Sequence, residues 1–403
     1  MNDYLVAKTA KTLRMGHMKK IFFIFSLITL PAFSASMNGF EPSYWGFIKA
    51  SSMYSTEGLA SFNNVNHSAP THAVGHVSGR SQDKMSRLSF QTQQSRIGLG
   101  LKKGENLSGK LEFDFIDFNK SSPTTQMNPR VRIASITYKF DDHNKIIVGQ
   151  DWDLFSPVGS FTFDIVGLYF MAGNTGFMRQ QFQYIHDTDN WELGAAVGIA
   201  GNNPGVIDND LELGKSPTYS ARISRKLNKG RVGVSAIYSR LHYTVNDSTH
   251  DAYAGNAFYE QAINDRLDLK SEIYYGQNLN NIGSLGIGKG TATSNVKEYG
   301  GTLTANQKLT EKSIIFGGVG LAKADNRREV TPLTFGGTVA ANVIAQPGVT
   351  SNFLSRIGYN YLISEDFSWI NEVSRYDTRS RVAINHYQNN VAYGLETGFQ
   401  LRF

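Results

Sequence analysis

Apolar and polar residues alternate along this chain in runs of about ten, and this period of two constrains the fold more than any other feature. The C-terminal segment 393–403 is one such run, and its apolar positions are Tyr393, Leu395, Phe399, Leu401 and Phe403. Between them stand Gly394, Glu396, Gly398, Gln400 and Arg402. Successive side chains of a strand point to opposite faces. The pattern therefore predicts strands with one apolar face and one polar face.

The connections between these runs fall into two classes. Seven are tight turns rich in Asp, Asn or Gly, at 103–106, 141–144, 187–190, 228–230, 264–266, 309–312 and 364–366. Eight are longer, near 55–84, 120–128, 153–177, 201–217, 245–253, 278–295, 324–350 and 378–385. Together these connections join sixteen strands.

Short turns at one end and long loops at the other are typical of outer-membrane barrels. Because every backbone amide must be paired internally in lipid, a sheet can span a bilayer only when it closes. A soluble sandwich also alternates, but sixteen strands are too many for one sandwich. Aromatic residues also gather around one turn, at Tyr359, Tyr361, Phe367 and Trp369, as in an interfacial girdle. The predicted fold is all-β, a closed antiparallel transmembrane β-barrel of sixteen strands.

The first 35 residues resemble an export leader. Lys19 and Lys20 precede an apolar run at 21–33, which ends in small residues near Ser34 and Ala35. This order is that of a cleaved signal peptide at 18–35, preceded at 1–17 by an upstream extension or a longer n-region. The alternative is a buried first helix. Residues 36–403 would then form a single barrel domain.

The net charge and the cysteine content carry further information. Removing the leader lowers the formal charge of +6 to about +2, so no nucleic-acid partner is expected. The chain contains no cysteine, and an exported protein of this size without disulfides must rely on a large hydrogen-bonded framework.

Two stretches carry a family resemblance. SRIGLGLKKGENLSGKLEFDF at 95–115 is similar to the second and third strands of Gram-negative trimeric porins. PRVRIASITYKFDDHNKIIVGQDWDLF at 129–155 resembles their fourth and fifth strands, and KLEFDF with VGQDWDLFSP resembles the DcaP-like branch of dicarboxylate porins. The resemblance implies a homotrimer, a third loop folded into the bore, and a C-terminal Phe403 read by the outer-membrane assembly machinery.

The third long connection, 153–177, is unusually apolar for a loop. Phe161, Phe163 and Tyr169 lie in its middle, and a loop this apolar should pack against something. The resemblance places this loop inside the barrel, as a constriction; the alternative is a lid among the outer loops. Its acidic residues, Asp153 and Asp164, and Asp151 beside it complete the predicted constriction set.

Alternation and the resemblance together predict which charges face the bore. The basic set is Lys49, Arg96, Lys110, Arg130, Arg132, Arg179, Arg222 and Arg356, and the acidic set is Glu112, Asp114, Glu192 and Glu372. Arginines facing carboxylates across a bore would create a transverse field with a mild anion preference. The alternative is that each arginine pairs with a neighbouring acid to hold the wall. Gln150 faces the lumen in one phase of its strand and faces outward in the other.

These features favour a passive diffusion channel for small hydrophilic solutes and ions, seated in the bacterial outer membrane and needing no cofactor. A barrel enzyme would require a nucleophile and a base on the wall, and no histidine lies in such a pattern. His67, His72 and His76 are a weak metal signal. An adhesin or receptor would act through the loops at 55–84 and 324–350. The pattern names no particular solute.

Overall fold

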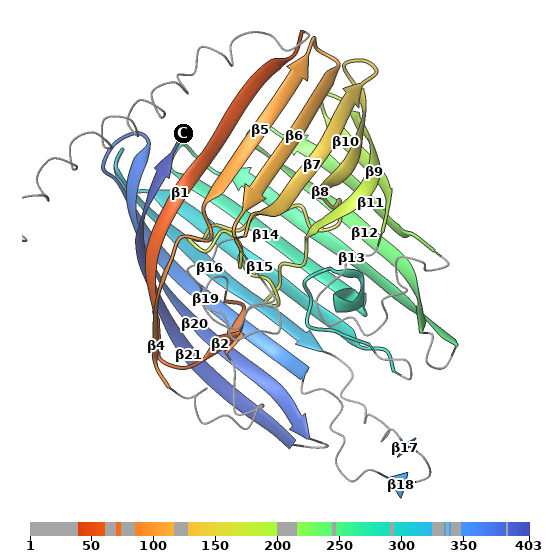
Figure 1. The fold of residues 1–403 in the computed structure, drawn as a ribbon, viewed down its shortest axis with the longest axis vertical. Helices are drawn as coiled ribbons and strands as arrows, with labels where there is room; N and C mark the ends of the chain where they lie inside the picture. Colours follow the sequence, from red (N-terminus) through yellow and green to blue (C-terminus); the bar gives the residue numbers. More distant parts are fainter. Residues whose placement is uncertain are drawn as a thin grey trace, which may run out of the picture.

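The chain folds into one large antiparallel sheet that closes on itself (Figure 1). The computed structural model describes residues 39–60, 70–73, 85–116, 128–199, 216–243, 247–290, 294–324, 334–335, 338–339, 348–383 and 386–403. The predicted leader at 1–35 lies outside them. No helix in the described part of the chain is long and apolar enough to cross a membrane.

Seventeen strand segments make up this sheet. They are β1 (Glu41–Ser55), β4 (Arg87–Gln91), β5 (Arg96–Lys103), β6 (Leu107–Asp114), β7 (Arg130–Lys139), β8 (Asn144–Trp152), β9 (Met178–Asp187), β10 (Trp191–Gly198), β11 (Thr218–Leu227), β12 (Gly230–Tyr243), β13 (Ser248–Ala262), β14 (Leu267–Gln277), β15 (Lys297–Lys308), β16 (Ser313–Ala324), β19 (Gly348–Leu362), β20 (Phe367–Ala383) and β21 (His386–Arg402). Outside the sheet lie two short pairs, β2 (Leu59–Ala60) with β3 (His72–Ala73) and β17 (Thr334–Phe335) with β18 (Thr338–Val339), and the 3-10 helix η5 (Leu279–Ile282).

The first and last strands seal the barrel. On one side β1 pairs with β21, from Phe47 opposite Arg402 to Ser55 opposite Gly394. On its other side β1 pairs with β5 and then with β4, which follow one another along the same edge. Since β4 and β5 together occupy one strand position, the barrel has sixteen strands, and the predicted fold class is confirmed.

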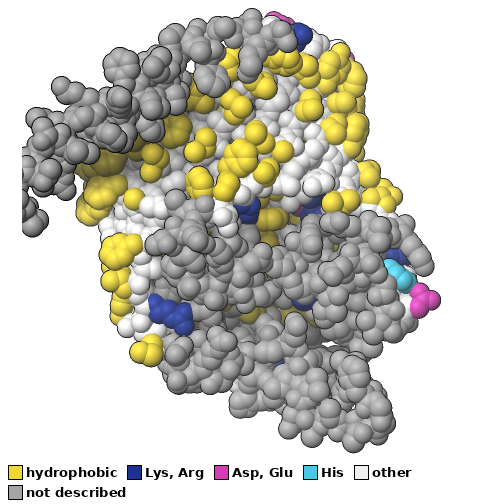
Figure 2. Space-filling model, viewed as in Figure 1, with side chains coloured by type: hydrophobic (Ala, Val, Ile, Leu, Met, Phe, Trp, Pro, Cys, Tyr) yellow, Lys and Arg dark blue, Asp and Glu magenta, His cyan; other side chains and the backbone are white. Residues whose placement is uncertain are grey.

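The two faces of the wall follow the predicted alternation. Side chains such as Ile273 and Ile357, each 63% exposed, point outward, and the space-filling view shows hydrophobic side chains spread over much of the upper wall (Figure 2). In the last strand Tyr393, Leu395 and Phe399 are exposed, whereas the intervening Glu396 is buried on the inner side. The polar inner face surrounds the interior in which the candidate site lies.

The seven tight turns are confirmed, and one shows its chemistry clearly. The Asp141 carboxylate accepts hydrogen bonds from the Asn144 side chain and from the backbone N–H groups of His143 and Asn144. These bonds, that of the Asn144 side chain foremost, lower the pKa of Asp141. A short polar side chain thus closes the turn in place of a backbone group.

Two of the predicted long connections are wrong. The one at 245–253 is short, because β12 and β13 remain paired as far as Tyr243 opposite Ser248. The one at 378–385 is shorter still, because β20 and β21 pair as far as Ala383 opposite His386. Polar residues here do not end the strands, since they bond across them; Arg240 Nε, for example, lies 3.0 Å from Asp251 Oδ1 on the facing strand.

Candidate constriction of the barrel

The connection between β8 and β9, residues 153–177, is called L3 here, and it lies inside the barrel. Its apolar side chains are buried in clusters that they form with the wall and with a neighbouring loop. Phe163 packs with Phe316 and Ile370, and Tyr169 packs beside Leu354 and Tyr376. The apolar middle that predicted a packed loop is therefore the part that holds L3 to the inner wall.

One carboxylate binds both ends of L3 at the base of the loop. Glu272, on the inner face of β14, accepts hydrogen bonds from Ser156 Oγ at 2.9 and 2.8 Å and from Asn174 Nδ2 at 2.5 Å. The Asn174 amide also donates to the Val158 carbonyl oxygen at 2.8 Å. The two arms of the loop are thus joined to each other and to β14 before the loop runs on across the barrel.

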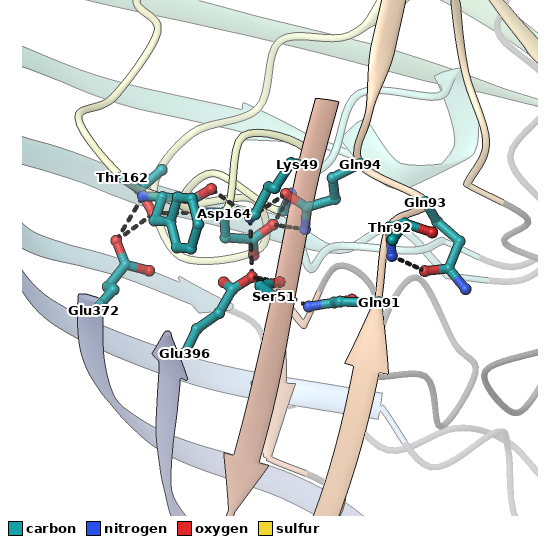
Figure 3. A network of polar contacts seen from close by, with 12 residues as sticks. Lys49, Ser51, Gln91, Thr92, Gln93, Gln94, Thr162, Asp164, Glu372 and Glu396 are labelled. Carbon is teal, nitrogen blue, oxygen red and sulfur yellow. Dashed lines mark hydrogen bonds and ion pairs between the residues drawn. The ribbon is translucent and has the colours of Figure 1, made fainter. Parts of the chain in front are cut away.

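Lys49 holds the far part of L3 to β1 (Figure 3). Its ammonium group donates to the Phe163 carbonyl oxygen at 2.7 Å and to Gln94 Oε1 at 2.8 Å, and lies 2.9 Å from Glu396 Oε1. The Gln94 amide donates in turn to Asp164 Oδ1 at 2.8 Å. One buried cation therefore joins the loop to three points of the wall around β1.

Arg356, on β19, attaches L3 to the wall at a second point. One guanidinium nitrogen lies 3.1 Å from Asp164 Oδ2, and another donates to Thr162 Oγ1 at 2.6 Å. Glu372 on β20 accepts from Thr162 Oγ1 at 2.7 Å and from the Phe163 backbone N–H at 2.8 Å. Burial raises the pKa of Asp164, and the charge of Arg356 opposes that rise. We call Lys49, Gln94, Thr162, Asp164, Arg356, Glu372 and Glu396 the L3 latch.

Replacing Lys49 by Met is expected to destabilise the barrel by about 3–5 kcal/mol, because Glu396 then keeps a buried charge without its cation. Urea unfolding in detergent, followed by the heat-dependent shift on gels, measures the change. Lys110→Met is the matched control, since that lysine is exposed on β6. Equal stability of the two variants would contradict the latch.

A second connection also lies inside the barrel, and the sequence reasoning missed it. It joins β14 to β15, is called L6 here, and is described at 278–290 and 294–296. Leu285 exchanges backbone hydrogen bonds with L3, its carbonyl accepting from Met171 at 2.9 Å and its N–H donating to Thr175 at 3.0 Å. Its side chain packs with Val166 and Phe170 of L3 and with Ile116. L3 and L6 are thus one interlocked body.

A cluster of charges lies on the stretch of wall at β5–β7. Arg132 lies 2.8 Å from Glu112 and 3.1 Å from Asp114, and Arg130 lies 2.5 Å from Asp114. Arg96 lies 3.5 Å from Glu112. Three arginines therefore share two carboxylates, and this arginine cluster (Arg96, Arg130, Arg132, with Glu112 and Asp114) carries a net positive charge.

The other predicted wall charges occupy different surroundings. Arg222 pairs with Glu192 at 2.7 Å, and both are only partly buried. Arg179 pairs with Asp153 at the start of L3, 3.0 Å away. Lys110 is exposed.

Six of the charges predicted to line the bore are buried. Lys49, Arg179, Arg356 and Glu372 lie beneath L3 or at its base, so they fasten the loop and do not line open water. Arg132 and Asp114 are also buried, paired with each other inside the arginine cluster. Alternation predicts which residues lie on the inner face but gives no sign of what covers that face.

Two details of strand β8 are settled. Asp151 belongs to the strand rather than to L3, and it accepts a hydrogen bond from Ser135 Oγ at 2.8 Å. The side chain of Gln150 lies on the same side of β8 as the exposed Val148 and Trp152, so Gln150 faces outward and not into the lumen. Its amide donates to backbone carbonyls of β7.

The histidine cluster weighed as a metal signal lies outside the described residues, apart from the backbone of His72. In the described part of the chain no group of three or more His, Asp or Glu side chains is placed to hold a metal ion. The loops on which an adhesin would depend, 55–84 and 324–350, also lie mostly outside the described residues.

Sixteen antiparallel strands closed around an inward-folded third loop define the architecture of the Gram-negative outer-membrane porins. The structure is similar to the outer membrane channel DcaP of Acinetobacter baumannii, with a TM-score of 0.68, 15% identity, and 91% of this chain and 99% of that chain covered. It is also similar to an anion-selective porin from Comamonas acidovorans, with a TM-score of 0.57, 11% identity, and 90% of this chain and 100% of that chain covered.

A third similar structure is the trimer form of OmpT, an outer membrane protein of Vibrio cholerae, with a TM-score of 0.52, 12% identity, and 91% of this chain and 100% of that chain covered. No protein-family model matches the chain, and no curated protein matches it. The resemblance to porins, and to DcaP among them, is thus confirmed for the fold.

Proposed function

We propose that this chain is an outer-membrane porin, a water-filled channel for passive diffusion of small hydrophilic solutes with a mild preference for anions, carboxylates above all. The observation that carries the proposal is the position of L3, fastened along the inner wall from β13 round to β1 while the arginine cluster occupies β5 and β7. Residues 18–35 serve as the export signal, and the barrel is inserted by the assembly machinery through Phe403.

The charges on the two sides of the interior support an anion preference. The arginine cluster has one more arginine than carboxylates, and the exposed Lys110 adds another positive charge on the neighbouring strand. The L3 latch contains two cations and three carboxylates, so its formal charge is negative by one. The cations are Lys49 and Arg356, and the carboxylates are those of Asp164, Glu372 and Glu396. A solute between them experiences a transverse field. Arginine also offers a fork that fits a carboxylate with two hydrogen bonds.

Liposome swelling tests this proposal directly. Vesicles containing the purified protein should swell faster in gluconate than in glucosamine, because the two solutes have similar size but opposite charge. Vesicles without protein are the control. Equal swelling rates in both solutes would remove the anion preference, and no swelling above the control would remove the channel itself.

We further propose that the chain works as a homotrimer. Strands β6 and β10 have 8 residues each, whereas β20 and β21 have 17. A tilted strand of eight residues rises only about 19 Å, less than the apolar band of about 25 Å that a barrel presents to lipid. Short strands suit a wall covered by protein, and a trimer form of OmpT is among the similar structures. Analytical ultracentrifugation tests this, and the mass of one chain would contradict it.

A further inference from the structure

The outward face of the barrel is not apolar along its whole length. On β20 the outward positions run Trp369, Asn371, Val373 and then Arg375, Asp377, Arg379 and Arg381. A tilted strand crosses the hydrocarbon layer in about 9–11 residues. Counted from the aromatic residues at the turn end, the apolar layer ends close to Asp377. The basic residues that follow therefore lie at headgroup level, on the side of the long connections.

Neighbouring strands add a second cation at the same level. In the register of the sheet, Lys323 of β16 lies opposite Ser351 of β19, and Ser351 lies opposite Arg379 of β20. These three residues share the outward side of the wall. Two strand spacings separate the Cα atoms of Lys323 and Arg379 by about 10 Å, and the hydroxyl of Ser351 lies on the strand between them.

The row formed by Lys323, Ser351 and Arg379 offers hydrogen-bond donors that suit an anion. Arg379 lies with its guanidinium 4.6 Å from the centre of the Tyr387 ring, which orients the group. Its Nε is buried and has no hydrogen-bond partner among the described residues. Within those same residues no carboxylate forms a salt bridge with Lys323 or Arg379. An unpaired guanidinium N–H close to a second cation favours a negatively charged acceptor, because charge-assisted hydrogen bonds are the stronger ones.

We propose that Lys323, Ser351 and Arg379 form a binding site for the phosphorylated headgroup of an outer-leaflet amphiphile, whose acyl chains lie along the apolar wall below. This inference rests on the proposed membrane location and not on ion passage. Phosphate fits because its oxygens can accept from a guanidinium, an ammonium and a hydroxyl together. The apolar surface beneath the row, with Val319, Leu321 and Ile357 exposed, continues directly into the site.

The test is native mass spectrometry of the detergent-solubilised protein with diphosphorylated lipid A and with its dephosphorylated form. Wild-type protein should retain the phosphorylated form, and Lys323→Ala with Arg379→Ala should weaken retention about 25-fold, which is about fivefold for each charge removed. Arg266→Ala with Lys312→Ala is the matched control, because these two exposed cations lie at the opposite rim. The control should bind as wild type does.

Two results would overturn the site. One is equal retention by wild type and the Lys323/Arg379 double variant. The other is equal retention of the phosphorylated and dephosphorylated lipids, which would mean that only the acyl chains bind. Single-channel conductance of the double variant should equal that of wild type, since neither residue faces the interior. A barrel that binds the lipid but carries no current would refute the proposed porin function while leaving this site intact.

Discussion

Deleting residues 160–172 is expected to raise single-channel conductance about threefold or more, because a barrel of sixteen strands has a wide lumen and conduction depends on what narrows it. The structure makes this deletion practical. Val158 and Asn174 already touch through a 2.8 Å hydrogen bond, and both arms of the loop are tied to Glu272. Gly159 and Gly173 can therefore join across the base while the anchors stay in place.

Removing part of L6 is the informative comparison for that deletion. Loss of residues 283–289 leaves the L3 latch untouched but removes Leu285, which bonds to the backbone of Met171 and Thr175 in L3. Conductance should rise less than in the L3 deletion, since the latch still holds the loop across the lumen. Gly255→Ala is the inert control, because an added Cβ there meets open space. Unchanged conductance after the L3 deletion would mean that the loop does not set the width of the channel.

Neutralising Arg96 and Arg132 together, each to Gln, is expected to convert the mild anion preference into a cation preference. The change leaves Arg130 alone with Glu112 and Asp114, so the cluster becomes net negative. The sign of the reversal potential in a salt gradient should therefore invert at low ionic strength. The effect should weaken in concentrated salt, because screening then shortens the range of these charges.

Arg222→Gln provides the control for this selectivity change. Arg222 also lies on the inner face and pairs with a carboxylate, Glu192, but on β10 and β11, outside the arginine cluster. Its loss should shift the reversal potential much less. If the double variant kept the wild-type reversal potential, the cluster would serve only to hold the wall, as ion pairs between neighbouring strands can.

The barrel was predictable from the sequence because the patterns that specify it, alternation within a strand and polar residues at a turn, each lie within a short segment. Alternation in a strand such as 393–403 determines which side chains face outward from the barrel, and Asp141 and its counterparts mark the tight turns. Strand ends were less predictable, because pairs such as Arg240 and Asp251 satisfy each other only once the strands are aligned. Without its partner strand, a polar strand end therefore has the same sequence pattern as a loop.

The candidate site was predictable only in part. Parity correctly placed Lys49 and Arg356 on the inner face, and apolarity predicted that L3 would pack. Their burial depends on partners far away in the chain, such as the contact between Lys49 and the Phe163 carbonyl, which no local pattern contains. Gln94, Glu272 and Glu396 were missed as buried partners because an isolated polar residue on an inner face gives no signal of its own. The apolar residues within L6 were a usable signal, since Leu279, Ile282 and Leu285 recur in a Gly- and Asn-rich segment.

A planar-bilayer recording of the purified wild-type protein measures directly whether one sealed barrel carries ions through its interior. We predict discrete upward current steps of uniform size, with a reversal potential on the anion side in a potassium chloride gradient. If protein that its heat-dependent gel shift shows to be folded leaves the bilayer silent at every voltage, the barrel is not an open channel.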